Sequence, residues 1–201
     1  MTPFLELPEL RPAGAFARQL GMYALLFALV FAVALLMRGG LPALRFAPAP
    51  ADLGLGLAGI VVYAAYNALF PALFSLTAAG RSLLALLAAR NRTLFGKLPL
   101  WTMLVMAALA GVCEEVLFRG WLQPLLGVWL ASFLFALVHF PPHRYRWAHP
   151  ATWAMVLLYV PVGLALGFLY AWRGNLLAPM VAHALSDSLG LFALWRARAA
   201  A

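Results

Sequence analysis

Long apolar windows separated by short charged segments make up most of this chain. An α-helix needs about 20 predominantly apolar residues to cross the roughly 30 Å hydrocarbon core of a bilayer. Six windows qualify, so the pattern predicts about six membrane-spanning helices. The windows are 19–37, 53–80, from 98 to the glutamate pair at 114, from 120 to about 140, 151–172 and 174–195.

The composition leads to the same class of protein. Apolar residues make up 66% of the 201 positions and charged residues 10%, whereas soluble domains are about half apolar and a quarter charged. The gaps between windows hold no soluble domain, so we expect one membrane domain over residues 1–201, an all-α, compact helical bundle. Residues 82–89 are too short to cross and are expected to form an interfacial helix. Gly163 and Gly167 have the small-xxx-small spacing that lets helices approach closely in lipid.

The net charge of +8 does not indicate a nucleic-acid partner, because the basic residues are spread over the predicted loops. Their distribution instead indicates orientation. With the N-terminus inside, about ten basic residues fall on inner segments and about three on outer ones. We therefore expect both termini in the cytoplasm and, from the Ala-, Leu- and Arg-rich composition, a bacterial inner membrane. The single cysteine, Cys113, excludes an internal disulfide.

Five ionisable residues lie inside the predicted spans, and they are the main candidates for chemistry. Intramembrane carboxylates cost about 2.5–3.5 kcal/mol even on insertion scales, so such groups face the bundle interior and usually mark function. The five are Glu114, Glu115, His139, His183 and Asp187.

Helical spacing predicts which of these side chains meet. Glu115 and Arg119 are four residues apart and share a helix face, so we expect an ion pair between them. Glu114 points about 100° away from Glu115, which leaves it for a different partner. His183 and Asp187 are also four residues apart and share a face.

Depth in the membrane gives an independent test. If the third and fourth spans join in a turn near residues 124–127, Glu114 and His139 both lie roughly 16 to 20 Å from the outer end. His183 and Asp187 lie roughly 14 to 20 Å deep by the same rise per residue. The four side chains therefore share one layer, and we expect them to form a buried polar site.

Three ordered motifs carry a family resemblance. Residues 114–119 read EExxxR, residues 135–139 read FxxxH and residues 183–187 read HxxxD. On successive helices, these motifs resemble the CPBP family, the CAAX protease and bacteriocin-processing intramembrane glutamic endopeptidases, with the myxosortases as one branch. The resemblance covers residues 98–190, which would be the catalytic core.

The resemblance implies peptide-bond hydrolysis inside the bilayer without a metal cofactor. Glu114 and His139 would activate a water, and His183 with Asp187 would bind the oxyanion. Glu115 and Arg119 would support the site. The last motif often ends in asparagine, so Asp187 must either be protonated or orient His183. The implied substrates are membrane-anchored proteins or peptides: CAAX-like, bacteriocin-related or sorting tails.

Two other functions fit the same residues. Two histidines and one or two carboxylates at one depth could bind zinc, although the chain lacks HExxH and Glu115 is assigned to Arg119. Intramembrane glutamates and histidines also relay protons in transporters, although no duplicated half is evident. A binding protein that confers immunity without cleavage is a further alternative.

Overall fold

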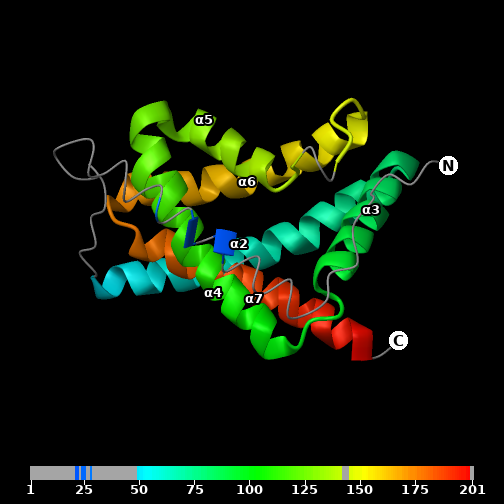
Figure 1. The fold of residues 1–201 in the computed structure, drawn as a ribbon, viewed down its shortest axis with the longest axis horizontal. Helices are drawn as coiled ribbons and strands as arrows, with labels where there is room; N and C mark the ends of the chain where they lie inside the picture. The colour runs from blue at the N-terminus through cyan, green and yellow to red at the C-terminus, as the bar shows by residue number, and fades with distance from the viewer. Residues whose placement is uncertain (1–20, 23, 26–27, 29–48, 142–144, 200–201) are drawn as a thin grey trace.

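The described part of the chain is entirely helical. A computed structural model describes residues 21–22, 24–25, 28, 49–141 and 145–199, so the predicted span 19–37 lies largely outside the described residues. The remaining order is α2 (Pro50–Ser75), α3 (Ala78–Phe95), α4 (Leu100–Glu115), the π-helix η1 (Val116–Leu122), α5 (Gln123–Val138), α6 (Pro150–Arg173) and α7 (Leu177–Ala199) (Figure 1). No strand occurs within these ranges.

Four helical stretches are long and apolar enough to span a bilayer. They are Pro50–Ser75, Leu100–Val138, Pro150–Arg173 and Leu177–Arg198. Large apolar side chains face outward from them: Val61 and Trp172, for example, are 70% and 69% exposed. Such a surface suits lipid, and the chain is an integral membrane protein.

The third and fourth predicted spans form one helical stretch of 39 residues, Leu100–Val138. At 1.5 Å per residue it would be about 58 Å long if straight, roughly twice the thickness of the hydrocarbon core. It bends at Gly127, whose φ of 78° is in the left-handed region that favours glycine. The bend lies within the predicted turn at 124–127, and the count of six spans stays a prediction.

α3 is longer than the interfacial helix predicted for residues 82–89. The α2 helix ends at Ser75, and α3 begins at Ala78. Thr77 is the N-cap residue of α3, and its side-chain oxygen accepts a hydrogen bond from the Gly80 amide at 3.0 Å. Because α3 carries several charged residues, it is not among the candidate spans. Its Leu83 packs with Phe140 and Tyr145 in an apolar cluster near the end of α5.

α7 packs between α2 and α4, and glycines make the contacts close. A Cβ atom on Gly59 would lie 2.7 Å from the Ala182 Cβ, and one on Gly111 would lie 2.7 Å from the Ala184 backbone nitrogen. α5 runs along α6 (Figure 1), where a Cβ on Gly163 would lie 3.0 Å from the Ser132 carbonyl oxygen. The predicted close approach at Gly163 is thus confirmed, and it joins α5 to α6.

Candidate active site

The EExxxR motif lies at the junction of α4 and η1. Glu115, the last residue of α4, is fully buried, and Arg119 is 1% exposed. The Arg119 Nη1 donates to the Glu115 Oε1 at 3.0 Å, which confirms the ion pair predicted from their spacing. Arg119 also donates from Nη2 to the Gly163 carbonyl oxygen at 2.8 Å, and its guanidinium lies 4.5 Å from the centre of the Phe135 ring. The ion pair is therefore fixed to both α5 and α6.

Gln123 extends this polar face by one more turn. Its Nε2 donates to the Gly167 carbonyl oxygen at 2.8 Å, just as Arg119 donates to the Gly163 carbonyl. Two donors four residues apart thus meet two carbonyls four residues apart on α6. Gln123 is not among the residues that the sequence motifs indicated, although its position four residues after Arg119 is a usable signal.

His183 joins α7 to the glutamate pair. Its Nδ1 lies 2.8 Å from the Glu115 Oε1, so one carboxylate oxygen contacts both His183 and Arg119. Its Nε2 lies 3.6 Å from the Asp187 Oδ2, which is beyond good hydrogen-bond geometry. His183 is 5% exposed, whereas the Asp187 side chain is 43% exposed. The sequence predicted the shared face of His183 and Asp187 but not the contact with Glu115.

Glu114 and His139 form the second half of the cluster. The His139 Nε2 lies 3.8 Å from the Glu114 Oε2, and their side chains are 22% and 13% exposed. On the other side of the imidazole, Nδ1 lies 2.7 Å from the Phe135 carbonyl oxygen. Because a carbonyl oxygen only accepts, Nδ1 must carry the hydrogen, and the Nε2 of a neutral His139 presents a lone pair towards Glu114.

Aromatic rings connect the two halves. The Phe135 ring centre is 4.8 Å from that of His139 and 5.7 Å from that of His183. On its other side, the His139 ring is 5.0 Å from the Tyr159 ring of α6. All six residues singled out from the sequence therefore lie in one connected group, in which Glu114 and Glu115 face different histidines.

Within the described residues, no group of three or more His, Cys, Asp or Glu side chains is arranged to hold a metal ion. Each of the two histidines contacts a different carboxylate, and Glu115 contacts both Arg119 and His183. The side chains instead form two carboxylate–histidine pairs, Glu114 with His139 and Glu115 with His183.

Comparison with known proteins identifies the segment that holds this group. Residues 96–189 match the family described as Type II CAAX prenyl endopeptidase Rce1-like. Over 99 residues the chain is 35% identical to a Bacillus subtilis (strain 168) protein described as uncharacterized protein YpbD, and the match covers 49% of this chain and 49% of that protein. The chain thus aligns with about half the length of this curated relative. No solved structure matches it. Residues 96–189 are thus similar to the Rce1-like CAAX prenyl endopeptidase family, which agrees with the resemblance that the three motifs indicated.

Proposed function

We propose that this protein is an intramembrane endopeptidase that hydrolyses a peptide bond of a membrane-associated protein or peptide. The observation that carries the proposal is the pair of acceptors formed by Glu114 and the Nε2 of His139, 3.8 Å apart. The family match supports the reaction class, because its description names an endopeptidase. The roles given below to individual residues are part of the proposal.

The separation of the two acceptors suits one bridging water. A 3.8 Å gap is too long for a direct hydrogen bond, but a water beside both groups can donate one hydrogen to the Glu114 carboxylate and the other to His139. Both lone pairs of the water oxygen are then left for attack. His139 is held in this tautomer by its Nδ1–H donation to the Phe135 carbonyl, so Nε2 remains the acceptor.

His183 provides a donor for the oxygen of the scissile carbonyl. When its imidazole is protonated, Nδ1–H donates to Glu115 and Nε2–H is left for an oxyanion, because Asp187 is 3.6 Å away. Asp187 then orients His183 and balances its charge, and it does not itself donate a hydrogen bond to the oxyanion.

Hydrolysis then takes two steps, attack of the water and departure of the amine. Glu114 takes a proton from the water as the water oxygen bonds to the scissile carbonyl carbon, and the carbonyl oxygen becomes an oxyanion beside His183. The proton passes from Glu114 to the amide nitrogen, the carbon–nitrogen bond breaks as the oxyanion re-forms a carbonyl, and the products are a carboxylic acid and an amine, which exchange a proton and leave as a carboxylate and an ammonium group. The Glu115–Arg119 pair takes no proton in this scheme and holds His183 in place.

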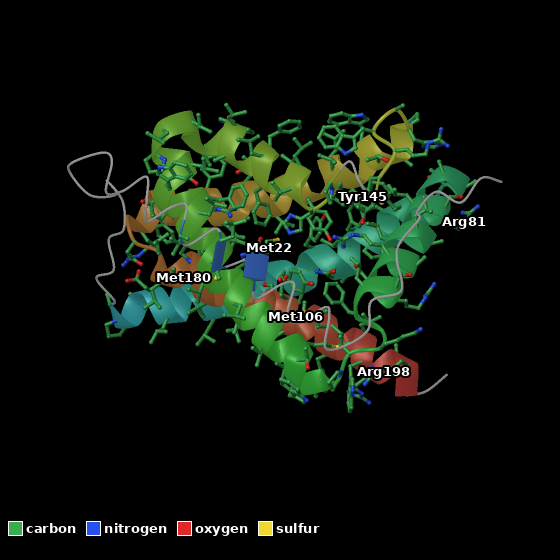
Figure 2. All side chains as sticks on the ribbon, in the orientation of Figure 1. Met22, Arg81, Met106, Tyr145, Met180 and Arg198 are labelled. Atoms are coloured by element: carbon green, nitrogen blue, oxygen red, sulfur yellow. The ribbon has the colours of Figure 1, made fainter. Side chains whose placement is uncertain are left out.

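Substrate reaches this site from the bilayer, and a membrane-anchored bacterial precursor, a sorting tail or a CAAX-like tail fits it. Basic residues suggest the orientation: Arg81 and Arg198 lie at the same end of the molecule, where α3 and the C-terminal end of α7 are found (Figure 2). The positive-inside rule places this end in the cytoplasm.

The experiment compares the membrane proteome of the native host carrying wild type, Glu114→Gln or Glu9→Gln at matched expression. Glu9→Gln is the same chemical change outside the predicted spans. A defined set of proteins should keep C-terminal or membrane-anchored segments only in the Glu114→Gln strain. Identical proteomes in all three strains would refute the proposal and favour immunity or proton movement. Cleavage by purified protein that a chelator abolishes and zinc restores would instead support the metalloprotease alternative.

A further inference from the structure

Arg90 is a buried cation outside the group described above. It lies on α3, is 7% exposed, and has no carboxylate within 4.0 Å among the described residues. Removing a guanidinium from water without an opposite charge costs several kcal/mol unless other groups compensate. A fold that buries such a group near a reaction centre requires an explanation beyond packing.

Neutral groups surround this guanidinium. Its Nε donates to the Tyr145 hydroxyl at 2.9 Å, and its Nη1 donates to the Asn91 side chain at 3.0 Å and to the Tyr159 hydroxyl at 3.1 Å. The rings of Phe140 and Tyr159 lie 5.1 and 5.6 Å away, within range of cation–π attraction. These contacts hold the planar fork in one orientation between α3, α6 and the segment after α5.

The remaining nitrogen of the Arg90 guanidinium, Nη2, points at the end of α5. The Arg90 Nη2 donates to the His139 carbonyl oxygen at 3.4 Å, and His139 is the C-cap residue of that helix. The last carbonyls of a helix have no partner within it, and a cation near them is favoured by the helix dipole. Trp147 serves the next carbonyl, since its Nε1 donates to the Phe140 oxygen at 2.7 Å.

Arg90 therefore contacts His139 in two ways. It bonds to the backbone of His139, and it holds the hydroxyl of Tyr159, whose ring lies 5.0 Å from the imidazole. Neither contact is a hydrogen bond to Nε2, the atom to which the proposed chemistry is assigned. Fraying of the α5 end would change the direction in which that nitrogen points.

We propose that Arg90 is a positioning residue that caps α5 from the neighbouring helix α3 and fixes His139 opposite Glu114. The inference deepens the proposed peptidase and rests on it for its kinetic consequence, but not for its structural one. A helix outside the four candidate spans would thus control the geometry of the catalytic layer.

The test uses full-length protein in lipid nanodiscs with two independent readouts. Arg90→Gln should lower kcat by roughly ten- to a hundredfold with little change in KM, because a misplaced His139 no longer orients the water for attack in the chemical step. Arg90→Lys keeps the charge but not the fork, so it should restore only part of the rate. Nitrogen NMR of labelled histidines, with the His139 signal assigned from a His139→Gln variant, reports its tautomer without any substrate. In Arg90→Gln the Nδ1–H signal should broaden or shift.

Two controls separate positioning from general stability. Arg92→Gln removes an exposed arginine of the same helix, and Trp147→Phe removes the donor to the adjacent carbonyl. Both should keep kcat and the His139 signal. If Arg90→Gln does not fold, Tyr145→Phe, which deletes only the acceptor of the Arg90 Nε, should give a smaller shift in the same direction.

The outcomes are distinct for the two proposals. An unchanged His139 signal and rate in folded Arg90→Gln, or in Tyr145→Phe when Arg90→Gln does not fold, overturns the positioning role. Equal effects in Trp147→Phe also overturn it, because they indicate general loss of the helix end. If the wild type cleaves nothing but the His139 signal still depends on Arg90, the peptidase proposal fails and the positioning role stands.

Discussion

Replacing Arg119 with methionine should strand a fully buried charge, the carboxylate of Glu115. Methionine keeps the length of the side chain but removes the donors to the Glu115 Oε1 and the Gly163 oxygen. Glu115 is fully buried, and its Oε2 accepts no hydrogen bond from the described residues. Removing one partner of a buried ion pair costs about 3–5 kcal/mol. Because His183 still lies 2.8 Å from Oε1, we expect a loss of about 3 kcal/mol.

A double-mutant cycle separates this effect from lost packing. Glu115→Gln alone strands Arg119, whereas Glu115→Gln with Arg119→Met leaves no stranded charge, so the double variant should lose less than the sum of the singles by about 2 kcal/mol. Unfolding in mixed micelles, followed by the fluorescence of the seven tryptophans, gives the three free energies. Exposed Arg81→Met is the control and should stay within about 0.5 kcal/mol of wild type. Additive losses, or a loss below about 1 kcal/mol for Arg119→Met, would refute the reasoning.

Two further predictions test packing and orientation. Gly111→Leu should force α4 away from α7, because even a Cβ there would lie 2.7 Å from the Ala184 backbone nitrogen; we expect a loss of about 1–3 kcal/mol and of any cleavage, and wild-type stability would contradict the close approach. Reporter domains fused to the two termini should both be cytoplasmic, and their appearance on opposite faces would exclude an even number of spans.

Much of the site was predictable because it depends on helical geometry. The spacing of Glu115 and Arg119 gives their ion pair directly, since residues four apart share a face. The common depth of Glu114 and His139 followed from two spans joined near Gly127, the residue at which the helix bends, and their pairing was what the family resemblance implied. Such predictions need only the rise and the rotation per residue of an α-helix.

Contacts that depend on how helices rotate against one another were not predictable. The bond between Glu115 and His183 joins residues 68 apart in the chain and needs the depth, tilt and rotation of α4 and α7. Arg90 lies in the sequence among the basic residues between the second and third predicted spans, yet the structure buries it, because α3 turns that face towards the end of α5. A charge count cannot distinguish an arginine in water from one under a helix end.

The glycine contacts along α7 decide which substitutions the molecule can accept. Gly59 of α2 and Gly111 of α4 touch the residues on either side of His183, Ala182 and Ala184. These positions need glycine because atoms of α7 occupy the volume that a Cβ atom would fill. Rotation of α7 by one residue, about 100°, would both turn His183 away from Glu115 and drive Cβ atoms into those glycines. The smallest chemical change, glycine to alanine, is therefore among the most disruptive changes at this interface.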